Sequence, residues 1–299
     1  MNGVNDTTGK SSWSTCFISG FVRVTMQMAL SRVSAAVQHL AHRSDKPLFV
    51  FLIDGKPSSG KSTMAKSLSR LIPNSSVLDA DAFLKPRVWR ERQMNQFLKA
   101  QLDLDELVVP PDFHTSFWDW ASLCDFIAGA HHAAESMSEG GTSLQFIHNA
   151  YNRATGERDG HARVNIRRGG ILLVPGCYLL GQLAPSVFQS SMMMTVTCDE
   201  GLRRKLMRED AKPNLPDASR FGTVAWSWIN IEEPTFETHM VNNCSKTQVI
   251  LDNSNWARPS IRKFSFNIDT DDNLQEPHWT PKRQPIERES VTKASFLGS

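Results

Sequence analysis

The sequence predicts an α/β fold with three layers, in which a five-stranded parallel sheet lies between two layers of helices. Apolar, strand-like runs alternate along the chain with segments of helical periodicity, as in a parallel sheet with crossover helices. A glycine-rich motif joins the first of these strands to a helix. Two alternating segments separated by turn residues also predict a small β-hairpin insertion.

The first predicted strand and the loop after it carry the most specific signal. Leu48–Ile53 is an unbroken apolar run, typical of a strand buried on both faces. Residues 55–62 read Gly-Lys-Pro-Ser-Ser-Gly-Lys-Ser, a complete G-x-x-x-x-G-K-[ST] pattern, and Thr63–Leu71 has helical spacing. Gly55 and Gly60 let the backbone turn its amides toward an anion, and the helix N-terminus adds partial positive charge. The segment predicts a nucleotide site, because a plain surface turn would not explain a Lys-Ser pair that opens a helix.

The expected cofactors are ATP and Mg²⁺. Lys61 is expected to reach the β- and γ-phosphates, and the Ser62 hydroxyl is expected to ligate the metal. The residues expected to contact the nucleotide are Gly55, Lys56, Pro57, Ser58, Ser59, Gly60, Lys61, Ser62 and Thr63.

The remaining elements follow in alternating order. The expected strands of the sheet are Ser76–Leu78, Ile171–Val174, Met192–Val196 and Val249–Leu251. The expected helices are Val88–Leu104, Phe117–Glu135, Leu202–Asp210 and a long stretch over Phe221–Asn243 that is interrupted near Pro234. The expected hairpin pairs Leu144–Tyr151 with Val164–Ile166, because Thr155-Gly156 and Asp159-Gly160 between them are turn residues.

We expect one domain over residues 21–252, preceded by a flexible N-terminus over 1–20 and followed by a partly disordered extension over 253–299. In that extension prolines alternate with charges, as in a loosely attached tail. Apolar residues from Met26 to Leu40 recur at helical spacing and predict a helix packed on the domain. The first 45 residues are rich in Ser and Thr and poor in acids, which leaves an organelle transit peptide as the alternative.

Composition narrows the class of protein. Thirty-three basic and 31 acidic residues give a formal net charge of +2, which favours neither nucleic acid nor an anionic membrane as a partner. No apolar run approaches the roughly 18 residues of a transmembrane helix. Five widely spaced cysteines without a C-x-x-C pair favour reduced thiols over disulfides or zinc, and with them a cytoplasmic location.

Four segments of the chain match the motifs of one enzyme family. Phe51–Thr63 contains the phosphate-binding loop, and Leu78–Phe83 is similar to a D-x-F-[YF] segment that follows the second strand. Phe113–Asp119 is similar to a D-H-P-x-x-F-D substrate loop. Gly170–Gly176, followed by Arg204–Arg208, is close to a G-hhhh-E-G strand and an arginine-rich lid. Over residues 48–252 the chain thus resembles the uridine kinase/phosphoribulokinase family, which implies a P-loop kinase fold with a helical lid.

Two positions depart from the family pattern. The strand-end Glu, which helps to hold Mg²⁺ or its waters, is replaced by Pro175. The lid lacks the usual R-D-x-x-x-R-G continuation, since Glu209 and Asp210 follow Arg208. Pro175 implies either that another carboxylate, with Asp79 the nearest, supports the metal, or that activity is reduced.

The resemblance also implies roles for residues around the loop. Asp81 is expected to be the general base, a contact of the acceptor and, with Asp79 and Ser62, a metal ligand, because the carboxyl end of the second strand adjoins the phosphate loop. The alternative is that Asp81 only caps the next helix. Lys61 is expected to be catalytic, by neutralising phosphate charge.

The lid and the acceptor side supply the other expected residues. Arg204 and Arg208 lie four residues apart on one helical face and are expected to close over the transferring phosphate as catalytic residues. The alternative is a solvated basic surface. His114, Tyr151 and Arg153 are expected to join Asp81 in binding the substrate, on analogy with the family alone.

The leading hypothesis is an ATP-dependent kinase that phosphorylates a hydroxyl of a nucleoside or nucleoside-like metabolite. The expected partner is therefore a small-molecule alcohol, without nucleic acid or membrane, and a homodimer is left open. The alternative is a nucleotide-binding regulator or low-activity pseudokinase, because of Pro175. A switch GTPase is disfavoured because the Asn-Lys-x-Asp motif is missing from the sequence.

Overall fold

The computed structural model describes residues 22–101, 109–110, 112–210 and 218–266. The expected N-terminal segment, residues 1–20, lies outside the described residues. So do residues 267–299 of the expected C-terminal extension.

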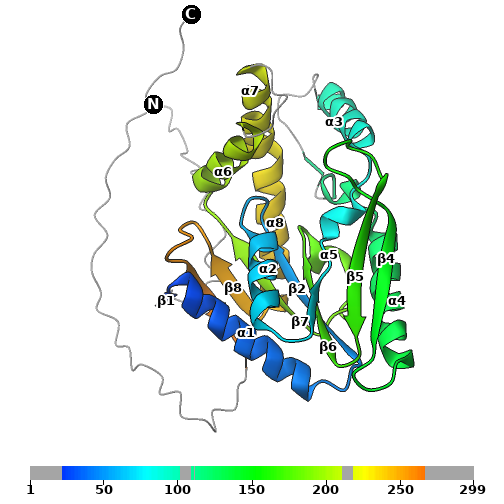
Figure 1. Ribbon diagram of the computed structural model, residues 1–299. Helices are drawn as coiled ribbons and strands as arrows, with labels where there is room; N and C mark the ends of the chain where they lie inside the picture. The colour runs from blue at the N-terminus through cyan, green and yellow to red at the C-terminus, as the bar shows by residue number, and fades with distance from the viewer. Residues whose placement is uncertain (1–21, 102–108, 111, 211–217, 267–299) are drawn as a thin grey trace, which may run out of the picture. The chain divides into compact units, whose positions relative to one another are not determined.

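Within the described residues, seven strands form the main sheet, in the order β1-β9-β8-β7-β2-β6-β3. They are β1 (Val22–Arg23), β2 (Leu48–Gly55), β3 (Ser75–Val77), β6 (Gly170–Pro175), β7 (Ser190–Thr195), β8 (Val249–Asp252) and β9 (Ser260–Phe264). The five strands from β3 to β8 in this order are all parallel. The predicted parallel five-stranded sheet is therefore confirmed (Figure 1).

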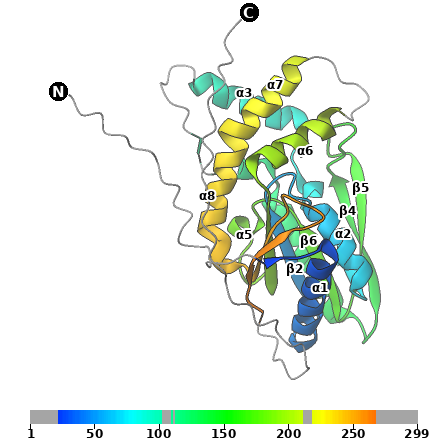
Figure 2. The ribbon, with the colours of Figure 1, turned by 90° about the vertical axis from the view of Figure 1, so that its left-hand side faces the viewer.

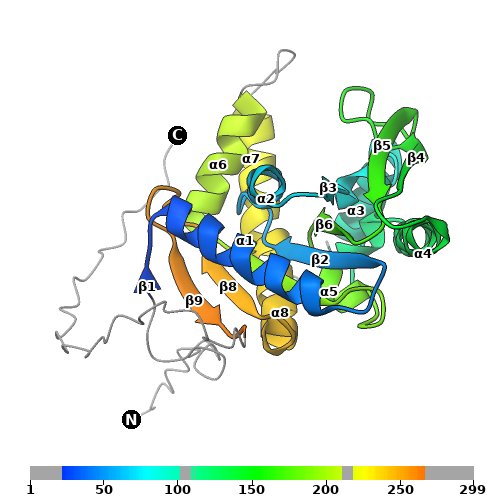
Figure 3. The same ribbon diagram turned by 60° about the horizontal axis from the view of Figure 1, so that its bottom comes forward.

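Two further strands, β9 and β1, extend this sheet and were not predicted. β9 pairs antiparallel with β8, and β1 pairs antiparallel with β9. The sheet thus continues past residue 252, where we expected the domain to end. Figure 3 shows these strands at one side of the sheet and the hairpin at the other.

Helices cover both faces of the sheet, because alternate residues of its strands point to opposite sides. Leu48, Val50 and Leu52 of β2 pack in a core with α4 (Trp120–Ser136), α5 (Leu179–Gln182) and α8 (Glu233–Asn243). Phe49, Phe51 and Ile53 pack in the other core, with α1 (Met26–Arg43) and α2 (Lys61–Leu71). In Figure 2 the sheet lies between α8 and α2, which gives the predicted three layers.

The other elements surround the carboxyl end of the sheet or flank it. They are η2 (Ala80–Phe83), α3 (Arg87–Gln101), η3 (Thr115–Phe117), the hairpin of β4 (Thr142–Ala150) and β5 (Gly160–Arg167), α6 (Cys198–Asp210), α7 (Ala218–Ser227), η4 (Trp228–Glu232) and η5 (Cys244–Lys246). The predicted hairpin is confirmed. The expected interruption near Pro234 is the π-helical turn η4, which ends just before it.

Two expectations about chemistry and location can be compared with the structure. Among the described cysteines Cys124, Cys177 and Cys198 are free, but Cys244 is disulfide-bonded, so the expectation of reduced thiols is wrong for Cys244. None of the described helices combines the length and apolar character needed to cross a lipid bilayer.

Candidate active site

The phosphate-binding loop joins β2 to α2, where the sequence predicted it. Gly60 precedes α2 with φ +94°, and Gly55 ends β2 with φ +154°. A Cβ atom at Gly55 would lie 2.2 Å from the Met194 carbonyl oxygen, and one at Gly60 would lie 2.9 Å from Asn253 Nδ2. Glycine is therefore required at both positions, by backbone conformation and by close packing.

Polar groups inside the loop fit a polyphosphate. The Ser59 side chain is buried and its hydroxyl has no hydrogen-bond partner among the described residues. Lys61 opens α2 with its ammonium group held 2.7 Å from the Lys56 carbonyl oxygen. Ser62, the expected metal ligand, follows in the first turn of α2, where backbone N–H groups point out of the helix. A buried hydroxyl and a buried ammonium beside a helix N-terminus are the chemistry that phosphate oxygens need.

Lys56 does not share this arrangement. Its ammonium group donates to the Val196 carbonyl oxygen at 3.0 Å and forms an ion pair with Glu233. These two contacts hold the Lys56 side chain outside the loop interior. Lys56 could therefore make the expected nucleotide contact through its backbone.

The ends of β3 and β6 bring acidic groups toward Lys61. Asp79 follows β3, and Asp81 lies in η2. The buried Cys177 thiol, just after β6, feels both the Lys61 and the Asp81 charges, and Asp79 feels the same two. Burial raises the pKa of Cys177 to about 11, so this thiol stays protonated. Lys61, Asp79 and Asp81 therefore share one site, with Cys177 at its wall.

The structure shows which of the two aspartates, Asp79 or Asp81, caps η2. Asp79, not Asp81, caps η2, since its Oδ1 accepts the Asp81 N–H at 3.1 Å. Burial, together with the neighbouring Asp81 charge, raises the pKa of Asp79 above its ordinary value. Asp81 instead forms an ion pair with Arg153 through Oδ2. Its carboxylate is thus free of the capping role.

The expected acceptor-side residues Tyr151 and Arg153 both lie next to the segment that carries Asp81. Tyr151 follows β4 and its N–H donates to the Ala82 carbonyl oxygen at 2.8 Å, beside Asp81, while its hydroxyl accepts from Arg90 at 2.7 Å. Arg153 contacts Asp81 directly. The structure therefore brings Tyr151, Arg153 and Asp81 together.

The described contacts of His114 are with other residues. It is buried, burial lowers its pKa to about 4, and the charges that act on it are those of Glu232 and Lys205. Its ring lies 6.4 Å from that of Tyr178, and its Nε2 has no partner among the described residues.

Two arginines of α6 reach the phosphate loop. Arg204 donates to the Ser58 carbonyl oxygen at 3.3 Å and to the Asn253 carbonyl oxygen at 2.7 Å. Arg208 donates to the Ser58 hydroxyl. The Arg203 and Arg204 guanidinium groups lower the pKa of Glu200 to about 2, so this carboxylate stays ionised. It forms an ion pair with Arg204. The expected shared face of Arg204 and Arg208 thus contacts the loop.

Sequence reasoning missed the residues that follow β8. Asn253 is fully buried and its Nδ2 donates to the Ser59 carbonyl oxygen at 2.7 Å. A cavity of about 670 Å³ beside it is lined by loop residues, Arg204 and Trp256. The signal was available, because β8 was predicted and the carboxyl ends of parallel strands meet at one edge of a sheet. The sequence alone, however, predicts a partly disordered extension from residue 253 onward.

A second missed group lies directly beneath the loop. Asp54 is fully buried; its Oδ1 accepts the Gly55 N–H at 2.6 Å, and its Oδ2 accepts from Leu180 N–H at 2.9 Å and His239 Nε2 at 2.8 Å. Burial raises the pKa of Asp54, but His239, the Leu180 N–H and Lys61 outweigh burial and hold the pKa below its ordinary value. Asn243 contacts the other ring nitrogen of His239 at 3.2 Å. No local motif marks such a distant pair.

The departure at Pro175 leaves the end of β6 without a carboxylate. Pro175 pairs with Ile53 of β2, next to Asp54. In the part of the chain that the structure describes, no three His, Cys, Asp or Glu side chains converge as a metal site. Mg²⁺ commonly takes few protein ligands and completes its shell with phosphate oxygens and water. Ser62, Asp79 and Asp81 therefore remain the residues that could hold it.

Comparisons with known proteins found one partial match in sequence. No family model matches the chain. Over 51 residues it is 43% identical to human (Homo sapiens) nicotinamide riboside kinase 1, a match that covers 17% of this chain and 26% of that protein. The chain thus spans about a quarter of the length of this curated relative.

The chain also matches solved structures at low sequence identity. A possible uridine kinase from Bacillus stearothermophilus is 14% identical with a TM-score of 0.43, covering 73% of this chain and 98% of that one. Phosphoribulokinase from Rhodobacter spheroides is 11% identical with a TM-score of 0.42, covering 70% and 71%. D-glycerate 3-kinase from Cryptococcus neoformans is 11% identical with a TM-score of 0.43, covering 71% and 87%. These are distant likenesses.

Proposed function

We propose that the protein is an ATP-dependent kinase that transfers the γ-phosphate to a hydroxyl of a small molecule, with a nucleoside or nucleoside-like metabolite as the acceptor. The observation that carries the proposal is the convergence of Lys61, Asp79 and Asp81 at the carboxyl ends of β2 and β3. Phosphoryl transfer needs positioned reactants, neutralised phosphate charge and a group that accepts the alcohol proton. This site has a candidate for each.

The phosphates would lie in the loop, with Lys61 and the α2 N-terminus neutralising their charge and Arg204 and Arg208 closing from α6. The base of the nucleotide would occupy the cavity lined by Arg204 and Trp256. Mg²⁺ would be held by Ser62 with Asp79 or Asp81, and when bound it would neutralise charge on the phosphate oxygens. These residues come from four separate segments that the sheet gathers at one edge.

Asp81 would act as the general base. Arg153 contacts only Oδ2 of Asp81, so Oδ1 remains to accept the proton of an incoming hydroxyl. Arg153 and Tyr151 stand on the acceptor side of Asp81 and would orient the substrate. The match to nicotinamide riboside kinase 1 supports a nucleoside-like acceptor, although it covers a small part of the chain.

A second function is favoured by one observation, the Pro175 that ends β6 where a metal-supporting carboxylate would stand. The protein would then bind the nucleotide with little turnover and act as a regulator. Both functions need the same loop, and they differ only in whether an acceptor gains phosphate.

The deciding experiment incubates the full chain with Mg-ATP and a panel of nucleosides, vitamins and sugar phosphates, and follows ADP release and the mass gain of one phosphoryl group. Asp81→Asn should lower turnover at least about a hundredfold, the usual contribution of a general base. The matched control Asp125→Asn, on an exposed position of α4, should leave it unchanged. Turnover that survives Asp81→Asn would remove Asp81 as the base. Tight ATP binding without transfer to any acceptor would favour the regulator.

A further inference from the structure

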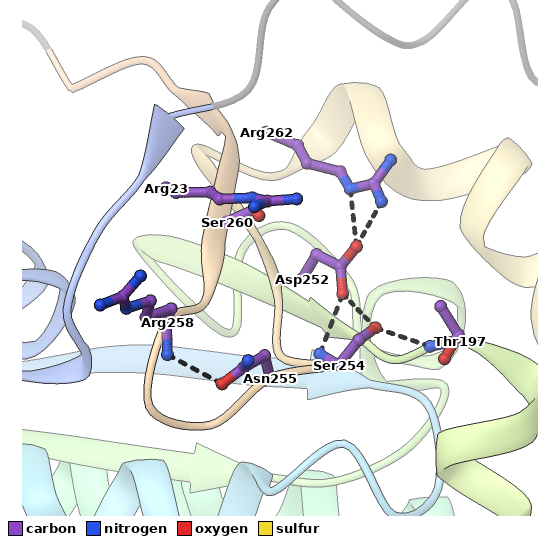
Figure 4. Close-up of a pocket in the computed structure, with 8 residues that line it drawn as sticks. All are labelled: Arg23, Thr197, Asp252, Ser254, Asn255, Arg258, Ser260 and Arg262. Atoms are coloured by element: carbon purple, nitrogen blue, oxygen red, sulfur yellow. Dashed lines mark hydrogen bonds and ion pairs between the residues drawn. The ribbon is translucent and has the colours of Figure 1, made fainter. Parts of the chain in front are cut away.

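A second cavity, of about 370 Å³, lies where β1, β9 and the segment after β8 meet, and arginines dominate its lining. Arg23, Arg258 and Arg262 face it together with one carboxylate, Asp252, and several hydroxyl and amide side chains (Figure 4). We call it the arginine cavity. It belongs to the part of the sheet that the sequence did not predict, and no step of the proposed kinase reaction uses it.

The register of the edge strands gathers these groups on one face. Arg23 pairs with Ser260, and Ser260 pairs with Asp252, so the three side chains lie in one row across β1, β9 and β8. Arg262 is the extra residue where the register shifts between Ile261 and Lys263, and its ion pair with Asp252 places it on the same face. Ile261, between them, packs in the core with α1 and α2. The arginine cavity thus opens on the face opposite α1, and the strand pairing itself defines it.

The residues that line the cavity include more basic than acidic side chains. Burial raises the pKa of Asp252, but hydrogen bonds from Ser254 and Arg262 outweigh burial and keep the pKa below its ordinary value, so Asp252 stays ionised. Asp252 forms an ion pair with Arg262. Among the described lining residues, three arginines accompany this one carboxylate. Within the described part of the chain, no hydrogen bond or ion pair engages the Arg258 guanidinium, and its backbone N–H is held by Asn255 at 3.1 Å.

We propose that the arginine cavity binds a small phosphate-bearing metabolite. Guanidinium groups present a planar fork of donors that matches phosphate oxygens in pairs, which makes arginine the usual residue for such recognition. A volume of about 370 Å³ is near the lower end of the range for small-molecule sites, roughly 300–1,000 Å³. It suits a compact phosphorylated metabolite and not a polynucleotide.

Occupancy of this cavity is coupled to the nucleotide site, because one segment separates the two. Ser254 and Asn255 line both the arginine cavity and the 670 Å³ cavity beside the phosphate loop. Asn253 and Trp256 of the same segment contact the loop, at the Ser59 carbonyl oxygen and beside Gly60. A ligand that fixes this segment from one side changes the affinity on the other, and the effect is reciprocal. This coupling, unlike the binding itself, rests on the proposed function.

Inorganic pyrophosphate is the probe, titrated into the full chain by isothermal calorimetry at about 0.15 M salt. The phosphate loop also attracts anions, so the titration uses the Lys61→Ala chain. We expect one saturable site there. Adding Arg258→Gln should weaken it about tenfold or more, the loss of one charge-assisted contact of about 1.4 kcal/mol. Adding Arg163→Gln, which removes the same charge from an exposed position on β5, should leave the affinity within about twofold.

Three results would overturn the site: no saturable heat in the Lys61→Ala chain, binding that Arg258→Gln leaves intact, or equal weakening by Arg163→Gln. A separate experiment tests the coupling. It compares the ATP dissociation constant of the parent chain with and without pyrophosphate at matched ionic strength. A change that vanishes in Arg258→Gln supports it, and equal constants refute it. If the chain binds no ATP, the proposed function fails, and the pyrophosphate titration still decides the arginine cavity.

Discussion

Replacing His239 by alanine tests whether a buried carboxylate ties the phosphate loop to α8. Asp54 is fully buried and accepts three hydrogen bonds, of which the one from His239 Nε2, at 2.8 Å, is the only one from a side chain among the described contacts. His239→Ala leaves this carboxylate with two backbone donors. Leaving a buried polar group without one of its hydrogen-bond partners costs about 1–3 kcal/mol, and more when the group is charged. We expect a loss of about 3 kcal/mol in the free energy of unfolding, at the upper end of this range because the Asp54 carboxylate is fully buried.

The measurement is urea unfolding followed by tryptophan fluorescence, with the slope against urea checked for each variant. His161→Ala is the matched control, since His161 is exposed on β5, and its effect should stay within about 0.5 kcal/mol. A loss below about 1 kcal/mol for His239→Ala would show that the Asp54 carboxylate does not depend on this imidazole.

The same pair predicts a dependence on pH. The pKa of Asp54 is below its ordinary value of 3.8 in the folded chain, so its contacts stabilise the fold above that value and lose this effect as pH falls through the folded-state pKa. The difference in stability between the parent and His239→Ala should therefore be full near neutral pH and should narrow in acid. A difference that widens below pH 3.8 would contradict this sign.

Two further changes probe the loop itself. Lys61→Ala should lower ADP release by several powers of ten, because it removes charge neutralisation from the transferring phosphate. Lys66→Ala, at an exposed position on α2, is the control and should leave ADP release unchanged. Activity of Lys61→Ala within about tenfold of the parent would contradict the phosphate role. Asn253→Ala should lower the free energy of unfolding by about 1–3 kcal/mol, because it leaves the buried Ser59 carbonyl without its donor. Urea unfolding checks the second change against Asn165→Ala on exposed β5, and equal stabilities would show that the bond to Ser59 contributes nothing.

Much of the fold could be predicted because the parallel strands are apolar on both faces. Leu48–Ile53 and Ile171–Val174 carry no polar residue, so neither can be mistaken for a surface element. β9 reads Ser-Ile-Arg-Lys-Phe and packs only one face against the core, so its pattern is too weak to be recognised. β1 has two residues and exists only through its pairing with β9.

The candidate site was predictable where a local motif defines it and not where distant segments meet. The loop around Lys61 follows from eight consecutive residues, and the shared helical face of Arg204 and Arg208 follows from their spacing, whereas their contacts with Ser58 appear only in the structure. His239 reaches Asp54 across 185 positions of sequence, and only the packing of α8 on the sheet reveals the pair. Lys56 shows that a motif does not settle the contacts of each of its side chains, because its ammonium group forms an ion pair with Glu233.

The pairing of β9 with β8 decides where a shortened chain can safely end. A truncation after residue 252 would remove β9 and leave β8 as an edge strand with unpaired amide and carbonyl groups. Other copies of the chain could pair with this edge, which would lead to aggregation. It would also remove Asn253, whose side chain donates a hydrogen bond to the Ser59 carbonyl oxygen. Expression and crystallisation trials should therefore keep the chain through Phe266.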